Sequence, residues 1–148
     1  MKKRFFLIIS VAMLLITSLI VISCGSDDEI DTGRGLSALY GRWMLQGYVS
    51  NGKFVSYEKI GARDCYLILE EDGNYHGQFC NRMDGEYSFS LEGEFLILSC
   101  ISTQVWSTDS DLMFMEEQIG KMKIKSFAFE GNCLNLYYSP NDYLKFSR

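Results

Sequence analysis

Histidine is nearly absent from this 148-residue sequence, which contains only His76. Catalytic arrangements of the Ser-His-Asp or Cys-His kind require a histidine base that a neighbouring acid supports. His76 lies just after a predicted hairpin turn, and the sequence identifies no acid beside it. We therefore expect a solvent-facing strand histidine, and a hydrolase is the least favoured class of function.

Metal-ligand spacings are missing as well. The sequence has five cysteines but no Cys-x-x-Cys pair, and its carboxylates are not grouped at ligand spacing. Structural zinc and catalytic transition metals require such sets of ligands. The sequence therefore predicts no metal, no cofactor and no enzyme activity.

The first 24 residues follow the pattern of an export signal. Three basic residues precede an apolar run over residues 5–22, and Ser23-Cys24 follow that run. This order is typical of a signal peptide (1–23) with a lipobox, in which the Cys24 thiol receives the lipid anchor. A retained transmembrane helix is the alternative, because the run approaches the roughly 20 residues that span a bilayer.

Residues 24–35 are rich in glycine and acidic side chains, so they are predicted to form a flexible, solvated tether. The acidic residues after Cys24 resemble the export signal of surface lipoproteins in Bacteroidetes-type bacteria, and solubility is the alternative reason for them. We expect an outer-membrane lipoprotein of the cell envelope, on the periplasmic face or at the cell surface.

The mature chain is predicted to be strongly acidic. Removing Lys2, Lys3 and Arg4 from the 14 basic residues leaves 11 against 19 acidic ones, a net charge of about −8. Such a charge excludes nucleic acid and an anionic lipid surface as preferred partners. The expected partners are the membrane, through the lipid anchor, and another envelope protein or a glycan.

Residues 36–148 are predicted to form a single, mainly β domain of the α+β type. Short runs of aromatic and branched residues alternate with turn residues, as in antiparallel hairpins. Turns are expected at Asp72-Gly73 and Glu92-Gly93, and a longer polar connection over residues 50–62. About eight strands and one helix, over residues 109–120, predict a barrel-like antiparallel sheet.

The order of several short motifs resembles the META or HslJ-like domain. The most specific piece is Cys80-Asn81 followed by Gly85-Glu86-Tyr87, and Thr103 and Glu116 come after it in the expected order. The resemblance covers residues 36–148 and implies a small barrel with one helix, found in envelope lipoproteins and associated with stress tolerance. It implies no catalytic residues. The second cysteine that the family usually carries is replaced by Ser107.

A second resemblance leads to a different class of function. Gly41-x-Trp43 near the first strand and Arg148 at the end of the last one are similar to small lipocalin-like barrels, where tryptophan and arginine stack to close the barrel. That resemblance implies a carrier of small molecules with an internal apolar cavity. Inward positions occupied by large side chains favour a filled interior instead.

The four cysteines of the domain are candidates for disulfides in an exported protein. A two-residue turn at Asp72-Gly73 places Cys65 opposite Cys80, and Cys100 and Cys133 are then the second pair by exclusion. Four reduced, buried thiols are the alternative.

Aromatic residues gather near the carboxyl end at Tyr137, Tyr138 and Tyr143. A surface stripe of tyrosines suits a carbohydrate or protein partner, whereas rings that fill a small core are the alternative. The sequence therefore favours an envelope lipoprotein without catalytic activity that has a binding or protective role.

Overall fold

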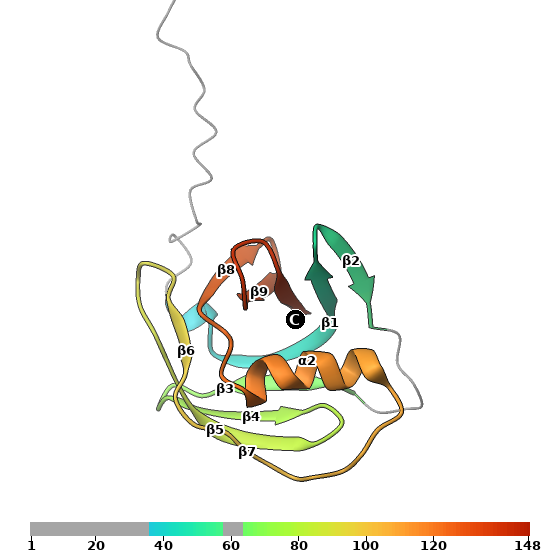
Figure 1. Ribbon diagram of the computed structural model, residues 1–148. Helices are drawn as coiled ribbons and strands as arrows, with labels where there is room; N and C mark the ends of the chain where they lie inside the picture. Colours follow the sequence, from blue (N-terminus) through green and yellow to red (C-terminus); the bar gives the residue numbers. More distant parts are fainter. Residues whose placement is uncertain (1–35, 58–63) are drawn as a thin grey trace, which may run out of the picture.

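The computed structural model describes residues 36–57 and 64–148, which form one antiparallel sheet curled into a nearly closed barrel with one α-helix (Figure 1). The predicted mainly β fold is thus confirmed. The predicted signal peptide (1–23), the lipidated Cys24 and the tether to residue 35 lie outside the described residues and stay predictions. No helix of the described part is long and apolar enough to cross a membrane.

The strands follow one another around the barrel in the order β6-β5-β4-β3-β1-β10-β9-β8, while β2 pairs with β1 and β7 with β5. In chain order the elements are η2 (Leu36–Ala38), β1 (Gly41–Ser50), β2 (Lys53–Ser56), β3 (Tyr66–Leu69), β4 (Asn74–Gln78), β5 (Arg82–Phe89), β6 (Phe95–Ile97), β7 (Ile101–Ser102), α2 (Ser110–Gly120), β8 (Ser126–Glu130), β9 (Cys133–Tyr137) and β10 (Tyr143–Ser147).

Strand β1 is long and bent, and it pairs with three other strands. Its first half pairs with β3 and its second half with β10 and β2. A register shift between Leu45 and Gly47 bends the strand. Gly47 has a φ of +148°, and a Cβ there would lie 2.1 Å from the Val55 carbonyl oxygen. Only glycine fits this bend.

The barrel closes where the β5–β6 hairpin meets β8, along a line that we call the seam. Glu94 and Ser126 form an isolated bridge. The Phe95 amide donates to the Lys125 carbonyl at 3.1 Å, and the Phe127 amide donates to the Gly93 carbonyl at 2.9 Å. The seam therefore has fewer backbone hydrogen bonds than the ladders elsewhere in the sheet.

Large side chains fill the interior of the barrel. In β10 the buried Leu144 and Phe146 alternate with partly exposed neighbours, as a half-buried strand requires. The same alternation in the other strands brings aromatic rings into the centre, among them Trp43, Tyr75, Phe79, Phe95 and Phe146. Side chains therefore occupy the space that a lipocalin-like carrier would use for its ligand.

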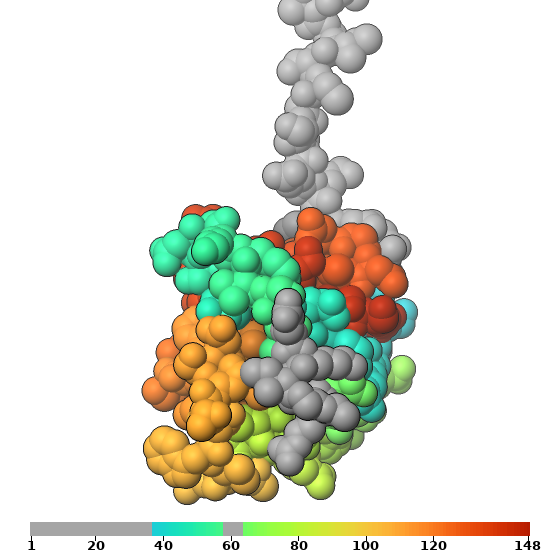
Figure 2. Space-filling view, turned by 90° about the vertical axis from the view of Figure 1, so that its right-hand side faces the viewer, coloured from blue at the N-terminus to red at the C-terminus, as the bar shows by residue number. Residues whose placement is uncertain are grey.

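Helix α2 covers one opening of the barrel (Figure 1). Asp109 caps its start by accepting hydrogen bonds from the amides of Asp111 and Leu112, at 3.1 and 3.0 Å. Leu112, Met115 and Ile119 recur at helical spacing and are buried in the core. The predicted helix over residues 109–120 is confirmed to within one residue. The space-filling view shows the β1–β2 hairpin, in green, above α2, in orange (Figure 2).

The first hairpin differs from its predicted register. Leu69 pairs with Tyr75 and Tyr66 with Gln78, so the turn has three residues, 71–73, rather than two. Asp72 accepts a hydrogen bond from the Asn74 amide at 3.0 Å, and Gly73 has a φ of +87°. This side-chain contact and the positive φ favour the longer turn. The geometry from which a Cys65–Cys80 disulfide was predicted is therefore wrong by one residue.

Arg148 packs against the segment around the start of β1. The guanidinium carbon lies 4.3 Å from the centroid of the Trp43 ring. The same guanidinium donates to the carbonyls of Ala38 and Tyr40, and Trp43 donates its indole N–H to the Leu39 carbonyl at 2.8 Å. The tryptophan–arginine stack expected from the lipocalin-like resemblance is therefore present, although the interior behind it is filled.

We expect Arg148→Ala to lower the free energy of unfolding by about 1–2 kcal/mol, because the change removes the stacking and leaves two carbonyls without their donor. Urea denaturation measures this loss. Lys125→Ala is the matched control, since this exposed cation makes no ion pair within the described residues. Equal stabilities of the two variants would contradict the locking role of Arg148.

Candidate functional site

The motif that carries the family resemblance forms a hydrogen-bond cluster around the buried side chain of Asn81. The Asn81 side-chain oxygen accepts from the Val105 amide at 2.6 Å and from the Thr103 hydroxyl at 3.0 Å. Its amide nitrogen donates to the Val105 carbonyl at 3.3 Å and to Glu116 at 2.7 Å. The side chain thus uses its donors and acceptors within the protein.

Glu116 completes this cluster from helix α2. Its second carboxylate oxygen accepts from the Asn81 backbone amide at 2.7 Å. One asparagine and one glutamate therefore tie three segments together: the β4–β5 turn, the segment 103–105 and the helix. Since every polar group has a partner and Asn81 is only 8% exposed, this cluster has a structural role.

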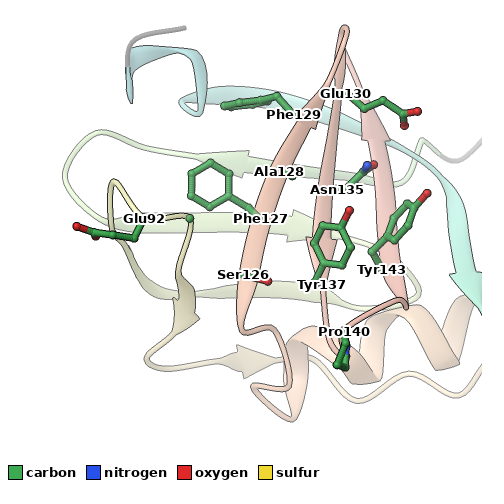
Figure 3. A pocket seen from close by; sticks show the side chains of 11 residues that line it. Glu92, Ser126, Phe127, Ala128, Phe129, Glu130, Asn135, Tyr137, Pro140 and Tyr143 are labelled. Carbon is green, nitrogen blue, oxygen red and sulfur yellow. The ribbon is translucent and has the colours of Figure 1, made fainter. Parts of the chain in front are cut away.

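The open site lies on the outer face of β8, β9 and β10, where a groove of about 590 Å³ is found (Figure 3). We call it the outer groove. Its volume is within the usual range of small-molecule sites. Its lining residues are Glu92, Gly93, Ser126, Phe127, Ala128, Phe129, Glu130, Asn135, Tyr137, Pro140 and Tyr143.

Two of the three predicted tyrosines meet in the outer groove. Tyr137 and Tyr143 are directly opposite each other in the β9–β10 ladder, and their ring centroids are 4.9 Å apart (Figure 3). Tyr138 is not part of the groove lining: its hydroxyl donates to the Val49 carbonyl at 2.8 Å and its ring packs on Phe114. The predicted group of three is therefore a pair plus a separate tyrosine.

Asn135, which the sequence analysis did not single out, lies beside this pair on the central strand. It is only 4% exposed, and within the described residues its Oδ1 has no hydrogen-bond partner. Burial raises the pKa of Tyr137, and the neighbouring Asn135 side chain acts against that rise. The hydrogen bond from Lys145 is the main cause of the lowered pKa of Glu130, and Asn135 contributes to it. Asn135 Oδ1 remains an acceptor without a donor among the described residues.

An ion pair borders the outer groove. Lys145 Nζ lies 2.7 Å from Glu130 Oε2. The hydrogen bond from Lys145 holds the pKa of Glu130 below its usual value, and the same contact raises the pKa of Lys145. Both groups thus stay charged around neutral pH, and their charges offset each other at this border of the groove.

Comparison with known proteins identifies the family of this chain. The model of the META domain matches residues 37–148, which is most of the chain. The chain belongs to the META domain family. The resemblance drawn from Cys80-Asn81, Thr103 and Glu116 is thereby confirmed. No curated protein matches the chain.

Solved structures share the fold of this META domain at low sequence identity. A protein from Burkholderia xenovorans, solved by NMR, is 17% identical with a TM-score of 0.58, over 73% of this chain and 81% of that one. A DUF4847 family protein from Bacteroides vulgatus, solved by crystallography, is 14% identical with a TM-score of 0.54, over 76% and 96%. A further NMR structure is 20% identical with a TM-score of 0.54, over 73% and 88%. These likenesses show the fold alone.

The META domain has a smaller cleft, of about 260 Å³, whose lining includes Cys65, Cys80 and Ser107. The position where the family usually has its second cysteine therefore lies in the same cleft as Cys80. The Cys65 thiol donates to the Tyr57 hydroxyl at 3.0 Å, and burial raises its pKa. Cys65, Cys80, Cys100 and Cys133 are all free thiols in the structure.

His76 has an acidic partner that the sequence analysis did not identify. The strand register places it directly opposite Asp84, and His76 Nδ1 lies 2.6 Å from an Asp84 carboxylate oxygen. The hydrogen bond from His76 is the main cause of the lowered pKa of Asp84. No serine or cysteine of the described residues hydrogen-bonds to this exposed histidine. The described residues also hold no group of three ligands that could bind a metal.

We expect Asn81→Ala to destabilise the META domain by about 2–4 kcal/mol, because it leaves the partly buried Glu116 carboxylate and the Val105 backbone groups without their partner. Thermal and urea unfolding measure the loss. Asn141→Ala in an exposed turn is the matched control. A loss of stability no larger than that of the control would show that the cluster does not stabilise the fold.

Cys65 is expected to react with iodoacetamide more slowly than Cys80, Cys100 and Cys133. Its burial raises the pKa of the thiol, and the thiolate is the reactive form. Peptide mass spectrometry of the folded protein over time measures the four rates, and the unfolded chain serves as the control with similar rates. Equal rates in the folded protein would contradict the expected protection of Cys65. Labelling that requires prior reduction would reveal disulfides.

Proposed function

We propose that this protein is an exported envelope lipoprotein whose META domain acts by binding another envelope component, without catalysis. The observation that carries the proposal is the outer groove. Tyr137 and Tyr143 offer two adjacent rings there, and Asn135 adds an unused acceptor. Aromatic rings combined with a few convergent polar groups are typical of binding sites.

The polar side chains that stood out as candidates for chemistry are paired with one another within the described residues. His76 is paired with Asp84 on an exposed face, and no nucleophile of the described residues contacts it. The buried Asn81 and the partly buried Glu116 hydrogen-bond to each other and to the backbone. We therefore assign no catalytic residue and no cofactor.

Anchoring at Cys24 fits this role. The tether of residues 24–35 reaches at most roughly 40 Å when extended, so a lipid on Cys24 would keep the domain near the membrane surface. Two or more acyl chains make such an anchor stable. The acidic net charge of the mature chain keeps it soluble beside a membrane.

A small-molecule carrier is the second candidate, and the Arg148–Trp43 stack favours it. The filled interior argues against it, because Tyr75, Phe79 and Phe146 are almost completely buried at the centre. An outer-face binding site requires no such cavity. We therefore place the ligand on the outer face of β8–β10.

One experiment in bacterial cells tests both parts of the proposal. The full chain is produced with a photoreactive phenylalanine derivative in place of Tyr143. The cells are grown with a fatty-acid analogue that labels lipoproteins. We expect acylation at Cys24, membrane fractionation, and light-dependent cross-links from position 143. Cys24→Ala should abolish the label and release the protein.

Controls separate specific from general effects. Cys100→Ala should keep the label, since Cys100 lies within the domain. The photoreactive group in place of Tyr66, an outer-face residue of β3 stacked by Arg42, should give no matching cross-link. An unlabelled chain would overturn the anchor, and equal cross-links from both positions would overturn binding at the outer groove.

A further inference from the structure

The unused oxygen of Asn135 restricts the chemistry of any ligand in the outer groove. Buried acceptors in folded proteins are almost always paired with a donor. Asn135 lines the outer groove, and its Oδ1 has no donor among the described residues. A ligand that completes this site must therefore bring an O–H or N–H donor.

The two tyrosines add a second requirement. The Tyr137 and Tyr143 rings are tilted by 49° with their centroids 4.9 Å apart, so they form a shallow aromatic platform beside Asn135 (Figure 3). Both rings are partly exposed, and Pro140 continues the apolar surface next to them. The ligand should therefore carry an apolar face in addition to its donor.

The charges around the groove add a third requirement. The Glu130 carboxylate at one border is paired with Lys145, and Glu92 lies in the lining without a cation of the described residues beside it. The mature chain carries a negative net charge as well. An anionic ligand would be repelled, so a neutral one fits best.

We propose that the outer groove binds a neutral saccharide, with the C–H face of a sugar ring against Tyr137 and Tyr143 and a sugar hydroxyl donating to Asn135 Oδ1. A sugar combines an apolar ring face with hydroxyl donors, which are the two features that the groove requires. This inference rests on the proposed function and names the ligand class for the same site. Because Oδ1 is shielded from bulk water, the side chains around it have to shift when the ligand enters.

Titration with defined neutral oligosaccharides tests the proposal. The full lipidated chain is held in a detergent without sugar groups and titrated with N-acetylglucosamine, glucose and mannose oligomers. Calorimetry and the ring resonances of labelled tyrosine report binding. We expect at least one oligomer to bind with micromolar to millimolar affinity and to shift the Tyr137 and Tyr143 resonances.

Variants of the groove identify the contacts. Tyr137→Ala, Tyr143→Ala and Asn135→Ala should each weaken binding by about tenfold or more, with unfolding midpoints measured in parallel to confirm that they fold. Trp106→Ala is the matched control, because this ring is 89% exposed and lies outside the groove. A deoxy analogue that lacks the donating hydroxyl should lose as much affinity as Asn135→Ala, since a site built for a hydroxyl rejects ligands without one.

Three outcomes would overturn the saccharide. None of the oligomers produces heat or moves a tyrosine resonance at millimolar concentration; binding is unchanged in all three groove variants; or acidic polysaccharides or peptides bind more tightly than neutral sugars. Cross-links from position 143 in cells distinguish the two proposals. If they persist while the sugars fail, the ligand class is wrong and the binding role stands, whereas loss of both removes the binding role.

Discussion

Three separate segments of the chain meet at the buried side chain of Asn81, and the arrangement of the barrel depends on this contact. The β4–β5 turn supplies the asparagine, helix α2 supplies Glu116, and the segment between them supplies the backbone of Val105. Hydrophobic burial draws α2 toward the core but does not fix its direction. The paired hydrogen bonds do, and they give Asn81 and Glu116 a structural role in the fold.

Much of the fold could be predicted from alternation and turn residues, because both are local properties of the chain. Alternation of apolar and polar residues indicates most of the strands. Asp109 together with Leu112, Met115 and Ile119 indicates the helix. Strand β2 lies where the sequence predicts a polar connection, because Lys53–Ser56 is largely exposed and has little apolar pattern. The first turn is one residue longer than the sequence predicts, because the contact that favours it joins the Asp72 side chain to the Asn74 amide.

The site could be predicted only in part, because it depends on pairing between strands. The tyrosines stand out by composition, yet Tyr138, one position past the end of β9, lies outside the groove that Tyr137 lines. Asn135 resembles any outward polar residue until its neighbours are known. The same holds for Asp84, which becomes the partner of His76 only through the register of β4 and β5.

The seam gives the barrel an uneven mechanical strength. Along the order from β6 to β8, each neighbouring pair of strands forms a ladder of at least three residue pairs, whereas β6 and β8 share one isolated bridge and a few backbone bonds. Local opening of the barrel should therefore start at the seam. The amides of the seam should exchange with solvent before those of β1 and β10. Gly93 and Phe127, which make one of these bonds, also line the outer groove. A ligand bound in the outer groove would contact residues on both sides of the seam. Ligand binding and the rigidity of the barrel are therefore coupled.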